Sequence, residues 1–344
     1  MDKFKDIRAY HTGWLLQIID WFTVLPLLHY FARTTTRGLR LDYLGDRNRI
    51  ERDIRHGATF LTNHRDIVMD AAWLSYLLRI RYNIRPYIGM GNNLFGKWWI
   101  EGAARFNRVF VVRRGVSAHE LIAKSRLLSE YIRHLRRHGK SIWLAQREGR
   151  AKDSDDRTQP SVLKMLCMTG EERSFFDQIR ELNICPVSIS YEYDPCDYLK
   201  AQEMQLKRDN PRWRKRAADD LLSMKTGILG RKGRVVFRLT PSINPALETL
   251  LQEHPELQEA SLNEQAQAVA HLIDRQIFAG YEEYKRGTDF EEYITERVKM
   301  VQVPEKDEAF LTEKIREMYS NPMRNKQELK NTDKYENSNI PGEF

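Results

Sequence analysis

An imidazole and two carboxylates lie close together in the segment 63–70, whose sequence is NHRDIVMD. His64 can accept a proton near neutral pH, and a neighbouring carboxylate can hold its ring in the tautomer that does so. Asp66 and Asp70 are the two candidates for that carboxylate. A histidine with an orienting acid is the minimum needed to activate a hydroxyl, so we interpret these residues as a candidate catalytic group.

A structural role for the same residues has to be weighed against catalysis. The apolar run 58–62 predicts a short buried strand, and Asn63 and His64 at its end could simply cap the helix that follows. Asp66 is well placed as a carboxylate at the start of that helix, where it favours the positive end of the helix dipole. On these residues alone, both interpretations stay open.

Basic side chains follow two more of the short apolar runs. Arg113 and Arg114 come directly after the run 109–112, and Glu148, Gly149 and Arg150 come shortly after the run 141–145. Guanidinium groups at the end of a strand can bind phosphate with two hydrogen bonds, and glycine lets the backbone approach a ligand closely. The alternatives are a solvated surface pair and an ordinary turn between strand and helix.

A fourth block is the apolar run 185–191, in which Pro186 lies near the start, where proline disturbs a strand least. The four blocks, in this order, resemble the glycerolipid acyltransferases of the bacterial lysophosphatidic-acid type, and the resemblance covers roughly residues 40–240. Two departures stand out: Met69 occupies the position five after His64 where the family usually has its acid, and no residue separates Gly149 from Arg150.

The resemblance implies an enzyme that moves a fatty acyl group from acyl-CoA or acyl carrier protein to the hydroxyl of a lysophospholipid. It implies that His64 is the general base, that Asp70 is the first choice and Asp66 the second for the acid that holds the imidazole, and that 1-acyl-glycerol-3-phosphate is the first candidate acceptor. A lyso amino-acid lipid and glycerol phosphate are the alternative acceptors. Substrate-binding and phosphate-binding roles are implied for Arg113, Arg114, Glu148, Gly149 and Arg150. No cofactor and no metal ion are expected.

Short apolar runs alternate with longer helical patterns, which is typical of an α/β domain with a mixed, mostly parallel sheet flanked by helices. We expect strands at 39–43, 59–62, 86–89, 109–112, 141–145, 185–191 and 235–239. We expect helices at 67–78, 94–103, 118–138, 161–168, 172–182 and 211–226. The expected organisation is amphipathic helices at 1–38, the acyltransferase domain at 39–245, a C-terminal helical appendix at 246–320 and a loosely attached polar tail at 321–344.

Composition limits the binding partners and the cellular compartment that we expect for this chain. The 344 residues carry a net charge of +8, which suits an anionic membrane surface or phosphorylated substrates as well as nucleic acid. Nucleic acid is not the expected partner, because no aromatic-interleaved basic platform is present. The three cysteines, Cys167, Cys185 and Cys196, lack the spacing of a zinc site and predict a reduced compartment.

The stretch 13–32 is apolar and aromatic, but Gln17, Asp20 and Pro26 interrupt it, so we do not expect a membrane-spanning helix. It could lie at the membrane interface or form part of the core, and the pattern favours neither. We expect a peripheral protein on the cytoplasmic face of the inner membrane. The rival from a different class is a non-catalytic basic membrane-binding protein in which His64 is structural.

Overall fold

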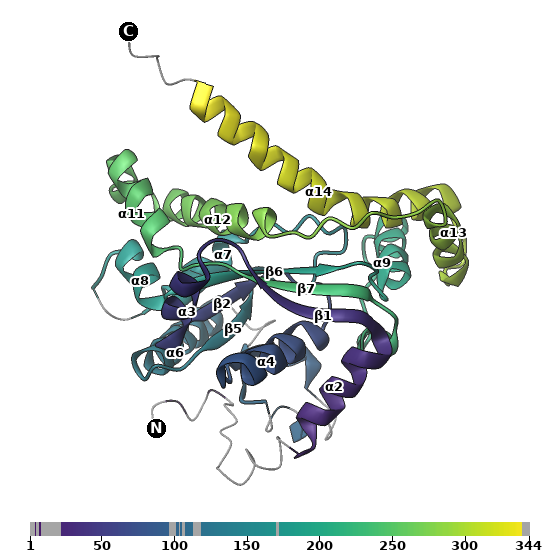
Figure 1. The fold of residues 1–344 in the computed structure, drawn as a ribbon, viewed down its shortest axis with the longest axis horizontal. Helices are drawn as coiled ribbons and strands as arrows, with labels where there is room; N and C mark the ends of the chain where they lie inside the picture. The colour runs from purple at the N-terminus through teal and green to yellow at the C-terminus, as the bar shows by residue number, and fades with distance from the viewer. Residues whose placement is uncertain are drawn as a thin grey trace.

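The computed structural model describes residues 4, 7, 22–95, 101–102, 104, 107–112, 118–169 and 172–338. A seven-stranded sheet lies between two layers of helices (Figure 1). All seven predicted strands are confirmed, with ends that differ by at most three residues. They are β1 (Thr36–Tyr43), β2 (Thr59–Thr62), β3 (Tyr87–Gly91), β4 (Val109–Val112), β5 (Ile142–Ala145), β6 (Ile184–Tyr191) and β7 (Gly233–Leu239).

The strand order is β1-β7-β6-β2-β5-β3-β4. Neighbouring strands are parallel except for β6 and β7, which pair antiparallel, so β1 and β7 run opposite to the other five. The predicted mixed, mostly parallel sheet is therefore confirmed. Strands buried on both faces read as continuous apolar runs, which is why β2 and β6, every residue of which is buried, could be found from the sequence.

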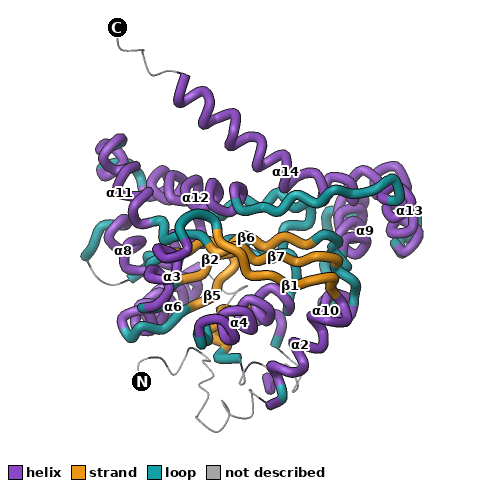
Figure 2. The backbone as a smooth tube through the Cα atoms, viewed as in Figure 1, coloured by secondary structure: helices purple, strands orange, loops and turns teal. Residues whose placement is uncertain are grey.

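Apolar side chains of the two helical layers form a separate core on each face of the sheet. Figure 2 shows the backbone of the strands with helices on either side. One face is covered by α6 (Ala118–Arg137), α7 (Pro160–Leu166), α8 (Phe175–Leu182), α11 (Asn244–Glu253) and α12 (Leu262–Ala279). The other is covered by α3 (Arg47–Arg55) and α4 (Met69–Tyr82), with α2 (Val24–Thr35) and α10 (Ala217–Leu229) packed beside them. Two short 3₁₀ turns, Asn92–Leu94 and Pro255–Gln258, complete these layers.

Most predicted helices are present, with shifted ends. The helix predicted at 211–226 begins later, at Ala217, and the one predicted at 94–103 lies largely outside the described residues. Helices α3 and α9 (Asp197–Asp209) were not predicted. In α3 only Ile50 and Ile54 are buried, a pair spaced by four that is too short a pattern to indicate a helix, and the helix starts where Asp46 accepts a hydrogen bond from the Asn48 N–H.

The C-terminal helices pack against the rest of the fold. Helix α12 contributes Val269, Ile273 and Ile277 to the core on its face of the sheet. Helices α13 (Phe290–Met300) and α14 (Glu308–Ser338) pack with α9 around a third apolar cluster. The N-terminal part of the predicted loose tail is also ordered structure, because Asn321 and Asn325 of α14 are buried.

Candidate active site

The site lies at the ends of two neighbouring parallel strands whose following connections lead to opposite faces of the sheet. Thr62 at the end of β2 pairs with Ala145 at the end of β5. The chain leaving β2 enters α4 on one face, whereas the chain leaving β5 runs through residues 146–159 to α7 on the other. Ligands of open α/β sheets bind at such a divergence, beyond the carboxyl ends of the strands.

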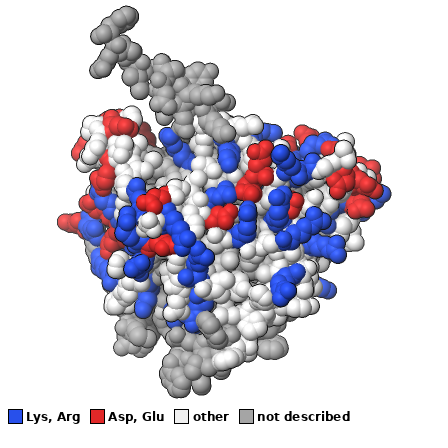
Figure 3. All heavy atoms as spheres, viewed as in Figure 1, with Lys and Arg blue, Asp and Glu red and all other residues white. Residues whose placement is uncertain are grey.

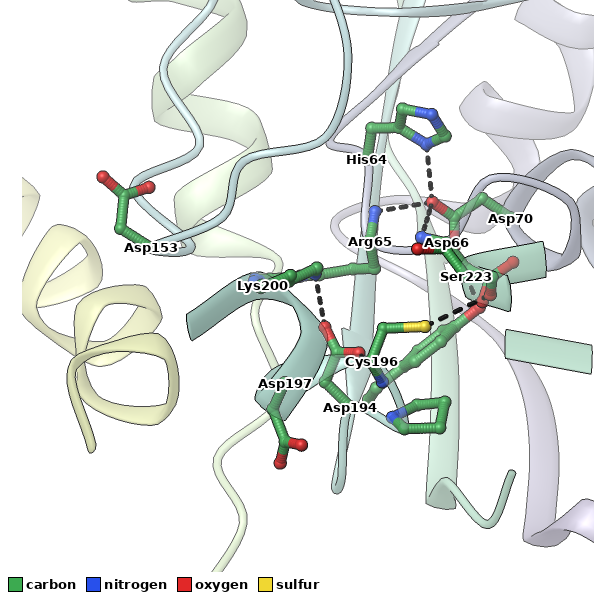
Figure 4. A network of polar contacts seen from close by, with 12 residues as sticks. His64, Arg65, Asp66, Asp70, Asp153, Asp194, Cys196, Asp197, Lys200 and Ser223 are labelled. Carbon is green, nitrogen blue, oxygen red and sulfur yellow. Dashed lines mark hydrogen bonds and ion pairs between the residues drawn. The ribbon is translucent and has the colours of Figure 1, made fainter. Parts of the chain in front are cut away.

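His64 and Asp70 form a hydrogen-bonded pair in the connection between β2 and α4. The Nδ1 atom of His64 lies 2.9 Å from Oδ2 of Asp70, in the first turn of α4. Figure 4 shows the ring turned so that Nδ1 faces Asp70 and the other ring nitrogen points away. If Nδ1 donates to Asp70, Nε2 is left without a proton and can act as a base.

The carboxylate of Asp70 is fully buried and fixed by further donors. Its Oδ2 atom also accepts hydrogen bonds from the backbone N–H groups of Arg65, at 2.6 Å, and Asp66, at 2.9 Å. Its Oδ1 atom accepts one from the Tyr191 hydroxyl at 2.9 Å. Burial and the nearby Asp70 raise the pKa of Tyr191, so this hydroxyl keeps its proton and acts as a donor.

Asp66 begins the helix rather than contacting the imidazole. Its Oδ1 atom accepts hydrogen bonds from the N–H groups of Val68 and Met69, both at 2.8 Å. Burial and the nearby Asp70 raise the pKa of Asp66. Of our two choices for the acid beside His64, the structure places Asp70 there and gives Asp66 the helix-start role.

Helix α10 packs directly against this loop through a glycine. A Cβ atom built on Gly227 would lie 1.9 Å from Oδ2 of Asp66, which no real contact permits. The absence of a side chain at Gly227 therefore allows α10 to approach the loop between β2 and α4. This close contact brings the next residues of α10 to the edge of the site.

His64 lies in the wall of a pocket of about 570 Å³. One part of the wall is apolar and comes from α4, β3 and α10, including Val68, Ala71, Met90, Met224 and Ile228. The other part is charged and comes mostly from the segment after β5, including Arg147, Glu148, Gly149, Arg150 and Lys152. The wall that contains His64 thus combines apolar and charged side chains.

Two guanidinium groups carry unused donors in the charged part. Arg147 Nε and Arg150 Nη1 are buried and have no hydrogen-bond partner among the described residues. Buried donors are normally satisfied, so these two atoms are exceptions. The other cations there are paired: Lys152 with Glu203, and Lys215 with Asp220 at 2.6 Å. Burial lowers the pKa of Lys152 to about 8, although Glu203 opposes this effect.

The structure brings most of the predicted site residues together. Glu148, Gly149 and Arg150 share the pocket wall with His64, and Gly149 has a φ of 72°, a conformation that glycine adopts without strain. The backbone N–H of Glu148 donates to Gln159 Oε1 at 2.7 Å, so it serves the turn rather than a bound oxyanion. Arg113 and Arg114 lie outside the described residues, so their predicted roles stay predictions.

Sequence reasoning missed Tyr191, Glu203 and Asp220. Tyr191 ends a predicted strand, and an aromatic residue at that position cannot be told from a core residue by sequence alone. Glu203 had no usable signal, because the helix α9 that carries it was not predicted. Lys215 stands in a basic concentration, 212–216, that was visible in the sequence but could not be placed in space.

The cysteines are poor candidates for a nucleophile. All three are buried, and burial raises the pKa of Cys167 and of Cys196 to about 12. A thiol that keeps its proton at neutral pH is a weak nucleophile. Among the described residues, no group of three His, Cys, Asp or Glu side chains is placed to hold a metal ion.

No family model matches the sequence, and the search of curated proteins also finds no match. In the described part of the chain, no helix has both the length and the apolar character needed to cross a membrane.

Proposed function

We propose that this chain is an O-acyltransferase that moves a fatty acyl group from acyl-CoA or acyl carrier protein to the hydroxyl of a lysophospholipid, with 1-acyl-glycerol-3-phosphate as the first candidate acceptor. The observation that carries the proposal is the His64–Asp70 pair in the wall of a pocket lined by both apolar and charged side chains. The order of the four sequence blocks, which resembles the glycerolipid acyltransferases, supports it.

In this proposal, Nε2 of His64 takes the proton of the acceptor hydroxyl while the hydroxyl oxygen attacks the thioester carbonyl. The new C–O bond forms, the C–S bond breaks, and the leaving thiolate takes the proton back from the imidazolium. Asp70 holds the imidazole by Nδ1 and stabilises the imidazolium, as the aspartate does in serine hydrolases. No nucleophilic side chain of the protein takes part, which agrees with the buried, protonated cysteines.

The two parts of the wall suit the two parts of such a substrate. The apolar part, with Met90, Met224 and Ile228, would contact an acyl chain. The guanidinium groups of Arg147 and Arg150, which line the pocket, would bind the phosphate of the acceptor or of the acyl carrier.

The alternative acceptors are a lyso amino-acid lipid and glycerol phosphate. Glu203 and Asp220 stand beside Lys152 and Lys215 in the charged part of the wall, so that part could also meet an ammonium group. This mixture of charges favours a zwitterionic headgroup as the second candidate. A panel of acceptors that carry a phosphate alone, an amino acid alone or neither distinguishes the three.

We also propose that the protein works at the cytoplasmic face of the inner membrane as a peripheral protein. On α2, Phe22 beside the helix and Leu27 and Tyr30 within it are more than half exposed. Leu222 and Leu229 of α10, which packs on α2, are also exposed. In the lower part of Figure 3, where α2 lies, the described charged side chains in view are Lys and Arg. The first part of the apolar stretch, residues 13–21, lies outside the described residues.

The enzymatic proposal is tested by incubating purified protein with a labelled acyl thioester and the acceptor panel. We expect transfer by the wild type, and a loss of at least about 100-fold in kcat for His64→Ala, the usual effect of removing a general base. His254→Ala is the matched control, because His254 also pairs with a carboxylate, Glu256, but on the surface. Near-normal turnover by a folded His64→Ala variant would contradict the proposal and favour the non-catalytic membrane-binding protein.

A further inference from the structure

Arg65, the residue next to His64, is fixed at both of its ends. Its backbone N–H donates to the same Asp70 oxygen that holds the imidazole, at 2.6 Å. Its guanidinium is almost fully buried, and Nη2 lies 2.7 Å from Oδ2 of Asp156. Two carboxylates therefore hold Arg65 in place, and one of them, Asp70, belongs to the candidate catalytic pair.

Asp156 is buried and depends on other groups for its charge. Burial raises the pKa of Asp156, and the Arg65 guanidinium is the strongest influence opposing that rise. The hydroxyl of Tyr281 also donates to Oδ2, at 2.8 Å, and the ring of Tyr281 lies 5.7 Å from the Arg65 guanidinium. Tyr281, the second residue after the end of α12, therefore contacts both members of the ion pair.

The same carboxylate joins the two chain segments that build the pocket. Asn63 Nδ2 lies 3.3 Å from Asp156 Oδ2, and Asn63 also exchanges two hydrogen bonds with the backbone of Ile189 in β6. Asp156 itself belongs to the segment after β5 that carries Arg147 and Arg150 to the pocket wall. A shift of Asp156 would therefore move the segment that carries His64 relative to the charged part of the pocket wall.

The C-terminal helices hold this segment at further points. Asp274 of α12 accepts hydrogen bonds from the N–H and the hydroxyl of Thr158, at 2.8 and 2.6 Å. Asn321 of α14 donates to the backbone oxygen of Asp153 at 2.8 Å. Unlike Asp274 and Asn321, Tyr281 contacts the ion pair of Arg65 and Asp156 directly.

We propose that Tyr281 is a positioning residue for His64, acting through Asp156 and Arg65. Its hydroxyl fixes the Asp156 carboxylate, Asp156 fixes the Arg65 side chain, and Arg65 holds the backbone that presents its own N–H to Asp70 beside His64. The effect on kcat that we expect rests on the proposed acyl transfer. The effect on the tautomer of the His64 imidazole does not depend on it.

Tyr281→Phe removes one hydroxyl and keeps the buried ring. We expect kcat for acyl transfer to fall about tenfold or more, because small displacements of a catalytic group are costly, with both KM values within about twofold of the wild type. Tyr284→Phe is the matched control: its hydroxyl is also buried and donates at 2.9 Å, but to the backbone oxygen of Ser190. Equal kcat losses in the two variants would overturn the proposal, as would a Tyr281→Phe effect confined to KM.

A second measurement does not need activity. In ¹⁵N-detected NMR of the histidine side chains, with the His64 signals assigned by their absence in His64→Ala, we expect the Nδ1 and Nε2 shifts of His64 to move toward a mixture of tautomers in Tyr281→Phe and to stay unchanged in Tyr284→Phe. Unchanged shifts in both variants would overturn the proposal. A wild type that transfers no acyl group to any acceptor would instead contradict the proposed function, and the NMR result would still decide the role of Tyr281.

Discussion

The two aspartates that follow His64 have different tasks although they stand only four residues apart. Asp70 holds Nδ1 of the imidazole, whereas Asp66 accepts the first free N–H groups of α4. Short sequence separation made the His64–Asp70 pair predictable, because both residues flank one strand-to-helix turn. Tyr191 completes the site from 121 residues further along the chain. Only the sheet, in which β6 lies beside β2, brings it there.

The division of tasks predicts opposite outcomes for two similar substitutions. Asp70→Asn should lower kcat/KM for acyl transfer strongly, by a factor of about 100 or more, because an amide cannot stabilise the imidazolium. Asp66→Asn should lower kcat/KM far less, because an asparagine still accepts hydrogen bonds at a helix start. The measurement is steady-state kinetics of both variants at one pH. The reverse order of the two losses would show that Asp66 orients His64.

The unpaired guanidinium of Arg150 predicts a binding effect. Arg150→Ala should raise KM for a phosphate-bearing acceptor by about tenfold while changing KM for the acyl donor little, since it removes an interaction with the bound anion. Arg157→Ala is the control, because Arg157 lies in the same segment but pairs with Glu328 on the surface. If KM for the donor alone rises, Arg150 binds the phosphates of the acyl carrier instead of the acceptor.

At the scale of elements, the strands were easier to predict than the helices. The inner strands β2 and β6 are short apolar runs between polar turns, and burial on both faces leaves little ambiguity. Edge strand β1, TRGLRLDY, is more polar and only partly buried, and its predicted start differs most from the observed one. Helix α9 was missed because most of its buried side chains are polar: Lys200 pairs with Asp194, and Gln205 and Glu203 are also buried. A helix that buries charged groups has no apolar stripe, and its contacts form only after α13 and α14 pack against it.

The contact between α12 and the segment after β5 predicts a pH dependence of stability. Burial raises the pKa of Asp274 to about 7, with Asp156 adding to the rise while the hydrogen bonds from Thr158 and the charge of Arg157 oppose it. The folded protein therefore binds a proton that the unfolded chain releases near pH 4, so this group favours folding less and less as the pH rises toward 7. Between pH 5 and pH 8 the loss is roughly 2 to 3 kcal/mol.

Asp274→Asn removes this titration and keeps an oxygen that accepts from Thr158. We expect the free energy of unfolding of the variant to fall less between pH 5 and pH 8 than that of the wild type, as measured by urea denaturation at both values. Other titrating groups are common to the two proteins and cancel in the comparison. Parallel pH profiles would show that Asp274 is ionised in the folded protein throughout this range.

At the scale of the whole molecule, the contacts between the C-terminal half and the site could not be predicted from the sequence. Residues beyond 246 were expected to be an appendix and a tail because their pattern is helical and increasingly polar. The polar residues are those that matter: Asp274, Tyr281 and Asn321 all bind the segment that carries the charged wall of the pocket. A polar side chain that binds another segment cannot be told from a solvated one until both segments are placed.

The proposed membrane surface is formed by α2 and α10, which expose apolar side chains, and α10 also lines the pocket. Figure 1 shows α2 on the side of the sheet opposite α12. Burial of aromatic and aliphatic side chains at the interface and attraction of basic residues to anionic lipid together give reversible binding. We therefore expect the full chain to float with anionic phospholipid vesicles, and high salt to weaken flotation without abolishing it. The variant Leu27→Ser, Tyr30→Ser should float clearly less at either salt concentration.

Leu262→Ser is the control for that experiment, because Leu262 of α12 is as exposed as Leu27, at 51%, but belongs to the helical layer on the other face of the sheet. It should float like the wild type. Equal flotation of all three proteins would show that α2 is not the anchor, and release by detergent alone would show that part of the chain spans the membrane. A loss confined to the α2 variant would place the membrane next to the pocket, so that a lysophospholipid could reach His64 without leaving the lipid surface.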